Sequence, residues 1–316
     1  MALTTPQAAK GAGLYLQAAA ASKAGRRAEA RNFLLQAADE GFADAHFTLA
    51  TMDLQGLEVP KDPSAACARL AKAADLGSNP GRRLLAALTA AGYGRPKDWA
   101  AATRLVIEAA RAGEREALRE AGLLLEIVSP GHAASDALLV QAARAGDGLA
   151  AVAVLRRSLT RPVSAFAPEM KSWAAAVESA RHPLGPQLRD AGRGELRVEA
   201  SEIVWDEIGE ILSGGWREPA VPTLLTQGRP RVAKVDDFAS VEECDYLIGK
   251  TAPMLRPSAV IDERTGRSMM HPVRTSSNAT LWPIDQDLVV HCINERAAAL
   301  AQTDPDCAEM LSVLCY

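Results

Sequence analysis

Aromatic side chains and long apolar runs are both scarce in this sequence. Phe, Trp and Tyr together make up 4% of its 316 residues, which disfavours an aromatic-rich β domain. No stretch approaches the roughly 18 consecutive apolar residues of a membrane-spanning helix. The N-terminus has no basic region followed by a long apolar block, as a signal peptide would have. We therefore expect no membrane partner and a cytoplasmic location.

An excess of basic charge is also lacking. The formal net charge is -4 and the sequence pI is near 5.8, so no basic field would attract nucleic acid. The length favours two domains, and an apolar content of 48% is ample for buried cores. These values predict a partner that is a protein or a small molecule, and no nucleic acid.

Cysteine pairs and metal-ligand motifs are absent as well. The cysteines are odd in number and have no Cys-x-x-Cys spacing, which predicts free thiols in a reducing compartment. No histidine is followed at the second position by Asp or Glu. There is also no phosphate loop, serine elbow or zinc-finger spacing. The residues concerned are Cys67, Cys244, Cys292, Cys307 and Cys315, and His46, His132, His182, His271 and His291.

An internal repeat is the clearest feature that is present. When the chain is slid by 36 positions, a set of residues in the first half falls on identical residues. The Ala-Ala-x-x-Gly element of this set also appears at residues 37–41 and 142–146, which predicts about four helical hairpins. The matched residues are Leu49, Ala50, Gly56, Pro60, Lys61, Asp62, Ala65, Ala66, Ala73, Ala74 and Gly77, which fall on Leu85, Ala86, Gly92, Pro96, Lys97, Asp98, Ala101, Ala102, Ala109, Ala110 and Gly113.

Each repeated position has a mechanical reason. The glycines that close the units, such as Gly77 and Gly113, suit the positive φ that follows a helix. Pro60 marks the loop between two helices, and Asp62 can cap the helix that follows. Each unit exposes an apolar face that only its neighbour can cover, so the array is expected to stack into a solenoid.

These units resemble the Sel1-like subclass of tetratricopeptide-type repeats, over residues 28–180 with a degraded fifth unit near Trp173. The pattern shared with that subclass is the glycine before the loop, the Asp62 that opens the second helix, and the closing Ala-Ala-x-x-Gly, whereas Leu49-Ala50 departs from the usual Leu-Gly of the first helix. The resemblance implies an α-solenoid that binds a client protein or peptide.

The second half has a different pattern. The linker is expected at residues 213–230, which gives a repeat domain at 1–190, a helix and linker at 191–230, and a second domain at 231–316. Ser240 and Glu243 form a predicted capping box. The expected elements are a helix within 201–212, strands at 231–238 and 257–261, helices from 240 to 248 and from 285 or 287 to 300, and a short apolar run at 311–314.

This second half resembles the first part of the prolyl 4-hydroxylase-like 2-oxoglutarate/iron(II) dioxygenases. The resemblance rests on residues in the same order as in the family, namely 235–238, 243–244, 258–262, 274–277, Asp287 with 289–290, Arg296, and 309–316. The expected fold class is α+β: an N-terminal solenoid of helical hairpins, then an incomplete α/β segment from the front of a double-stranded β-helix.

The resemblance also implies a site. In related enzymes the loop that matches Arg274, Thr275, Ser276 and Ser277 folds over the peptide substrate, and the tyrosine that matches Tyr316 faces the 2-oxoglutarate pocket. Fe(II), 2-oxoglutarate and ascorbate are the cofactors of the intact family domain. The family's His-x-Asp lies about ten residues beyond that tyrosine, so we assign no catalytic or metal-ligating residue and expect no tight cofactor binding by this chain.

Several residues have two interpretations. His291 and Glu295 are one helical turn apart and could share a metal, but a surface carboxylate on a family helix is the simpler alternative. Arg274 could clamp a peptide or be a plain exposed arginine. His271 could contact substrate or have no role in its loop. Cys315 could be a reactive thiol, although a small core residue at a strand end is favoured.

Three functions follow from these observations, the third being hydroxylation of a free amino acid or small molecule. The first is a repeat-scaffolded 2-oxoglutarate/Fe(II) dioxygenase, with hydroxylation of peptidyl proline by the intact parent and this chain ending before the iron ligands. The alternative is a non-enzymatic interaction scaffold, in which the repeats carry the whole function.

Overall fold

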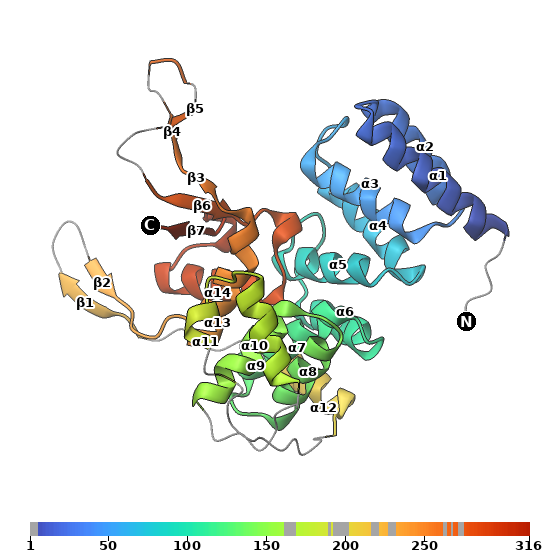
Figure 1. Ribbon diagram of the computed structural model, residues 1–316. Helices are drawn as coiled ribbons and strands as arrows, with labels where there is room; N and C mark the ends of the chain where they lie inside the picture. Colours follow the sequence, from blue (N-terminus) through green and yellow to red (C-terminus); the bar gives the residue numbers. More distant parts are fainter. Residues whose placement is uncertain are drawn as a thin grey trace. The chain divides into compact units, whose positions relative to one another are not determined.

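The computed structural model describes residues 6–160, 169–188, 191, 202–215, 221–226, 232–261, 264–266, 268–270 and 275–316 (Figure 1). The chain forms two compact units. The first holds Met1–Ala117 together with Pro283–Leu288, and the second holds Leu118–Trp282 together with Val289–Tyr316. The expected fold class is confirmed: the chain is mostly helical, with a few small antiparallel strands.

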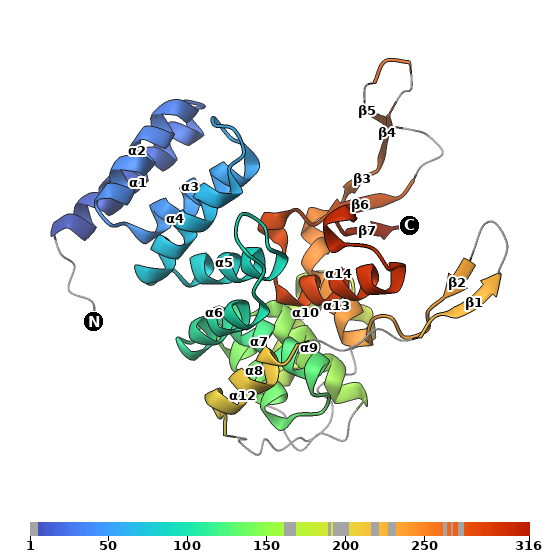
Figure 2. The same cartoon turned by 180° about the vertical axis from the view of Figure 1, so that it is seen from behind.

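Successive antiparallel helix pairs make up the first unit. Figure 2 shows them from behind. The helices pack mainly against their neighbours in sequence, as α1 does on α2 and α3 on α4, which is how a repeat array buries its apolar faces. Their bounds are α1 Pro6–Lys23, α2 Arg27–Asp39, α3 Ala43–Gln55, α4 Pro63–Asp75, α5 Asn79–Ala91 and α6 Trp99–Arg111.

The local signals that predicted these helices act as expected. The Asp62 side chain accepts a hydrogen bond from the Ala65 amide at 2.9 Å, and Asp98 accepts one from Ala101 at 2.8 Å. Both are N-caps that satisfy an amide with no partner inside the helix. Gly77 and Gly113 have φ of 91° and 81°, so the unit-closing glycines are needed for a left-handed backbone.

One short segment from the second half of the sequence belongs to this first unit. The 3-10 turn η2, Pro283–Asp285, contacts both α3 and α5. Ile284 packs against a buried cluster that includes Leu84 and Leu88. The first unit is therefore not built from the repeats alone.

The second unit contains further repeat helices and the helices of the C-terminal segment. In this unit α8 packs on α9, α9 packs on α10, and α13 also packs on α9. The first turn of α7 and the first residue of α14 lie in the first unit. The bounds are α7 Arg115–Val128, α8 Ala133–Arg144, α9 Gly148–Thr160, α10 Met170–Ser179, α11 Gly185–Leu188, α12 Trp205–Ser213, α13 Val241–Thr251, η1 Ala252–Met254, α14 Leu288–Ala301 and η3 Pro305–Cys307.

Among its described residues, this unit also has three small antiparallel sheets. β1 Thr223–Thr226 pairs with β2 Val232–Lys234, and β4 Ala259–Ile261 pairs with β5 Ser268–Met270. The third sheet has the order β3-β6-β7, with β3 Arg256–Pro257, β6 Ser277–Thr280 and β7 Ser312–Cys315. β1 lies within the expected linker at 213–230 and pairs with the strand that follows it.

Candidate functional site

The three-stranded sheet brings two of the predicted site segments to one end. In the antiparallel β6–β7 pair, Ser277 lies opposite Cys315. Tyr316 follows Cys315, and Ser276 precedes Ser277, so both continue from the same end of the sheet. The sequence places these two segments about forty positions apart. The sheet register makes them neighbours.

The predicted substrate residues differ in how accessible they are. Ser276 is buried, its carbonyl accepts a 2.9 Å bond from the Ser258 amide, and its hydroxyl bonds to the Ser258 hydroxyl at 3.2 Å. Thr275 is exposed and Ser277 is half-buried. Ser276 therefore ties the segment to the start of β4, whereas Thr275 is free to meet a ligand. Arg274 and His271 lie outside the described residues.

The face of β7 that carries Tyr316 is exposed. Side chains alternate along a strand, so Leu314 and Tyr316 point to the same side. Leu314 is 44% exposed and Tyr316 is 96% exposed. Cys315 is also exposed, which corrects its interpretation as a core residue. In the part of the chain that the structure describes, β7 is also an edge strand of its sheet.

Sequence reasoning missed a buried arginine at the centre of the second unit. The Arg157 side chain on α9 is 1% exposed and binds both carboxylate oxygens of Glu242 on α13, at 2.7 Å each. It also donates to Ser135 at 3.0 Å, pairs with Asp136, and lies 3.3 Å from Glu126. A planar guanidinium suits such a multidentate arrangement.

These neighbours set the charge of Arg157. Burial alone would lower the pKa of its guanidinium. The hydrogen bonds to Glu242 and the charges of Glu242, Asp136 and Glu126 outweigh burial and raise the pKa above its ordinary value. Arg157 is therefore a fixed cation that joins repeat helices α7, α8 and α9 to α13 of the C-terminal segment.

Two further ion pairs hold α13, one to α9 and one to α14. Arg156 on α9 binds Asp245 on α13, with one nitrogen-to-oxygen distance of 3.2 Å. Arg296 on α14 pairs with Glu243, whose other oxygen accepts the Ser240 amide at 2.8 Å. The predicted capping box is therefore confirmed. Its glutamate has a second role that the sequence did not indicate.

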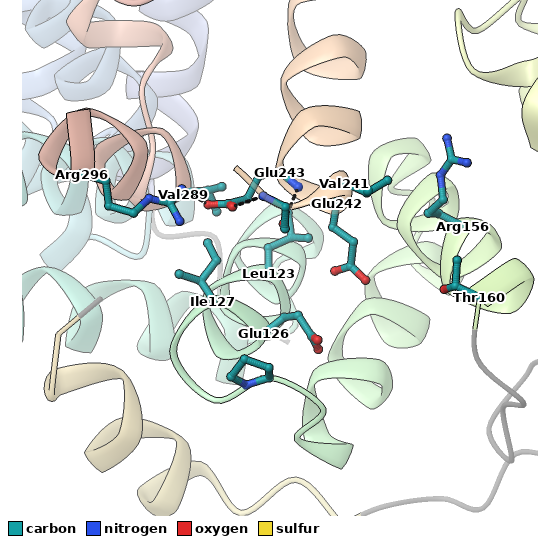
Figure 3. Close-up of a pocket in the computed structure, with 12 residues that line it drawn as sticks. Leu123, Glu126, Ile127, Arg156, Thr160, Val241, Glu242, Glu243, Val289 and Arg296 are labelled. Carbon is teal, nitrogen blue, oxygen red and sulfur yellow. Dashed lines mark hydrogen bonds and ion pairs between the residues drawn. The ribbon is translucent and has the colours of Figure 1, made fainter. Parts of the chain in front are cut away.

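A pocket of about 310 Å³ lies among these groups (Figure 3). It is lined by side chains of α7, α9, α13 and α14, with charged groups of both signs. In Figure 3, Glu126 from α7 and Glu242 from α13 face the same space. The carboxylates of Glu242 and Glu243 are held by arginines, so the pocket offers apolar walls formed by Leu123, Ile127 and Val289 beside neutralised charge.

The close packing of α13 explains one glycine and one histidine. A Cβ on Gly249 would lie 2.5 Å from Leu149 Cδ2 and 2.9 Å from His182 Nε2, so a larger residue here requires these side chains to shift. His182 accepts the Leu184 amide through Nδ1 at 3.2 Å. Burial lowers the pKa of His182, and the charge of Asp245 opposes this with a smaller effect.

His291 and Glu295 also lie close together. His291 Nε2 is 3.6 Å from Glu295 Oε1, and their side chains are 5% and 10% exposed. The interpretation of Glu295 as a surface carboxylate is therefore wrong. Among the described residues, no three His, Cys, Asp or Glu side chains come together as metal ligands, so this part of the chain does not fit an iron site. The described helices include none long and apolar enough to cross a membrane.

Comparisons with known proteins identify two parts. Prolyl 4-hydroxylase 1 of Arabidopsis thaliana is 33% identical over 134 residues, which are 42% of this chain and 46% of that protein. Probable prolyl 4-hydroxylase 3 of the same plant is 38% identical over 94 residues, 30% of this chain and 32% of that protein. The chain thus spans less than half the length of these relatives. No family model matches it.

Among solved structures, a Sel1 repeat protein from Oxalobacter formigenes superposes with a TM-score of 0.50 and 21% identity. The match covers 65% of this chain and 90% of that one. The chain combines Sel1-like repeats with a prolyl 4-hydroxylase-like part. Because the structural match is below 25% identity, it shows the fold of the repeats and nothing of what they bind.

Proposed function

We propose that this chain is the repeat-bearing part of a 2-oxoglutarate/Fe(II)-dependent prolyl 4-hydroxylase, with the repeats presenting a client protein or peptide. The identity to prolyl 4-hydroxylases carries the proposal. The β6–β7 register supports it, because it places Thr275–Ser277 beside the strand end that bears Tyr316. The free thiols support a cytoplasmic location, since they suit a reducing compartment.

The reaction of the complete enzyme would consume dioxygen and 2-oxoglutarate. One oxygen atom enters a C–H bond of a peptidyl proline, the other enters succinate, and carbon dioxide leaves. Iron(II) supplies the oxidising chemistry when bound, with ascorbate as the reductant that maintains it. The described residues do not fit the iron site, so the contribution of this chain is to bind and orient.

Each predicted site residue has a specific role in this proposal. The Tyr316 hydroxyl, at the exposed end of β7, hydrogen-bonds a carboxylate of 2-oxoglutarate. Thr275 and Ser277 contact the backbone of the client peptide, and Arg274 holds a peptide carbonyl or carboxylate through its guanidinium. Ser276 acts through Ser258 as a positioning residue.

These roles can be separated by kinetics in a chimera that continues from Tyr316 with the C-terminal part of prolyl 4-hydroxylase 1. Tyr316→Phe is expected to raise the KM for 2-oxoglutarate about tenfold, and Arg274→Ala to raise the KM for peptide with little change for 2-oxoglutarate. Tyr93→Phe in the repeats is the matched control. If both variants have the KM values of the unsubstituted chimera, the proposed site is wrong.

A non-enzymatic scaffold is the second candidate. It is favoured by the extent of the repeat fold, whose structural match covers 65% of the chain. The same chimera discriminates the two functions, because a scaffold binds its client with no peptide-dependent succinate release.

A further inference from the structure

The chain itself shows how its repeats hold a short peptide. Pro283, Ile284 and Asp285 sit on the first unit in contact with α3 and α5, which are the first helices of two successive repeat units. Ile284 packs against the buried cluster that includes Leu84 and Leu88. The repeat array therefore accepts a proline followed by a branched aliphatic side chain between consecutive first helices.

The same position one repeat earlier is an open groove. Sliding the α3–α5 pair back by 36 residues gives the α1–α3 pair, and a groove of about 380 Å³ lies there. Its size is within the range of peptide and ligand sites. Its walls combine apolar and hydroxyl groups: the lining includes Tyr15 and Ala19 of α1, Leu34 of α2, and Thr51 and Met52 of α3.

A difference at the loop between helices separates the two positions. In the later unit a Cβ on Gly94 would lie 2.4 Å from the carbonyl carbon of Pro63, so the loop is packed directly onto the start of α4. The equivalent residues one repeat earlier are Glu58 and Arg27, and both line the groove. Two long charged side chains replace a close backbone contact at this end of the groove.

The backbone at Glu58 adds an independent sign of function. Its φ is 63°, a left-handed conformation that suits glycine and is uncommon for glutamate. Strain of this kind is concentrated at ligand sites. The repeat supplies glycine at the equivalent position, so glycine is compatible with this loop, and glutamate occupies it at an energetic cost.

We infer that the α1–α3 groove binds a client peptide that carries, in a tight turn, a proline followed by a branched aliphatic residue and an acid. The chain's own Pro283-Ile284-Asp285, docked at the repeat-equivalent position, defines this chemistry, and Arg27 provides a cation for the acid. The inference rests on the client-presenting part of the proposed function. It names the surface and the class of peptide.

A labelled peptide with the sequence of residues 281–287 tests the inference on the full 316-residue chain. Fluorescence anisotropy is expected to show saturable binding. Replacing the peptide's Ile284 with Ala or its Pro283 with Gly is expected to weaken binding about tenfold, because an apolar anchor or the preformed backbone is lost. Equal affinity for all three peptides, or no binding, overturns the inference.

Two tryptophan substitutions on α1 locate the site. Ala19 is exposed and lines the groove, so Ala19→Trp fills it and is expected to weaken binding at least tenfold. Ala20 is also exposed and does not line the groove, so Ala20→Trp is the matched control. Unchanged affinity in Ala19→Trp places the peptide elsewhere, including the α3–α5 position, and contradicts the inference. Ala19→Arg repeats the test if the Trp variant does not fold.

Binding and turnover fail independently. A peptide that binds the groove while the chimera releases no succinate leaves the groove assignment in place and removes the hydroxylase function. If the chimera releases succinate and its Ala19→Trp variant has unchanged kinetics, the hydroxylase function stays in place and the groove assignment is removed.

Discussion

At the scale of single residues, Glu58 gives the simplest test of stored strain. Its φ of 63° is costly for a side chain with a Cβ, so Glu58→Gly is expected to stabilise the chain by up to about 1 kcal/mol in urea unfolding. Gly94→Ala at the equivalent position is the opposite case: the Cβ has no room beside Pro63 and stability falls. A destabilised Glu58→Gly would show that the strain argument is wrong.

Arg157 is expected to be the most sensitive charged residue. Arg157→Met leaves Glu242, Asp136 and Glu126 without their buried cation, and the loss of one partner from such a cluster typically costs about 3–5 kcal/mol. Arg144→Met is the control, because the Arg144–Glu169 pair is largely exposed and such pairs contribute about 0–1 kcal/mol. Equal unfolding free energies for the two variants would contradict the assigned role.

His182 makes stability depend on pH. Its folded pKa lies below the ordinary value of 6.5 because of burial, so the unfolded chain binds a proton more readily. The contribution of neutral His182 to the free energy of unfolding is complete above about pH 6.5 and is lost as the pH falls toward the folded pKa. His46 in the first unit has the same direction of shift. Urea unfolding at about pH 7.5 and about pH 5.5 should therefore show a smaller pH-dependent loss in His182→Gln than in the unsubstituted chain.

What the sequence predicted at this scale was local. The capping roles of Asp62 and Asp98, the positive φ of Gly77, and the Ser240–Glu243 capping box depend on residues a few positions away. The role of Arg157 depends on Glu242, which is 85 positions away. No nearby residue signals that pairing.

At the scale of elements, the packing of α13 on α9 depends on Gly249. Gly249→Ala places a methyl group 2.5 Å from Leu149 Cδ2 and 2.9 Å from His182 Nε2, and such overpacking typically costs about 1–3 kcal/mol. Gly148→Ala, at the start of α9, meets nothing within 4 Å and is expected to be neutral or slightly stabilising. In thermal melts, the melting temperature should fall below that of the unsubstituted chain in Gly249→Ala but not in Gly148→Ala. Equal melting temperatures for the two variants would show that α13 is free to shift.

The elements that sequence reasoning missed also have physical reasons. α1 belongs to the repeat array, but Ala24-Gly25-Arg26 stands where later units have Pro-Lys-Asp, so the usual punctuation is lost. β1 is a short strand whose stability comes from its pairing with β2, and its sequence follows a stretch rich in glycine and proline. Whether such a short segment forms a strand depends on the strand with which it pairs and not on its own sequence alone.

At the scale of the whole molecule, the two halves of the sequence do not map onto separate bodies. Pro283–Leu288 belongs to the first compact unit, and α13 packs on the repeat helix α9 in the second. Periodicity identified the repeats, and the resemblance of ordered segments to a known family identified the prolyl 4-hydroxylase-like part. The contacts between segments distant in sequence required the structure. We therefore expect residues 231–316 alone to show rapid amide hydrogen exchange in α13, because the partners of Glu242 and Asp245 lie in the repeats.

The most direct measurement of the central claim is oxygen transfer to a proline peptide by the chimera that extends this chain with the C-terminal part of prolyl 4-hydroxylase 1. With iron(II), ascorbate and 2-oxoglutarate, we predict succinate release that depends on the peptide and a matching gain of one oxygen on its proline. The 316-residue chain alone, assayed in parallel, should release no succinate above a metal-free control. A folded, iron-loaded chimera that leaves the peptide unchanged, or turnover by the 316-residue chain itself, would contradict the account.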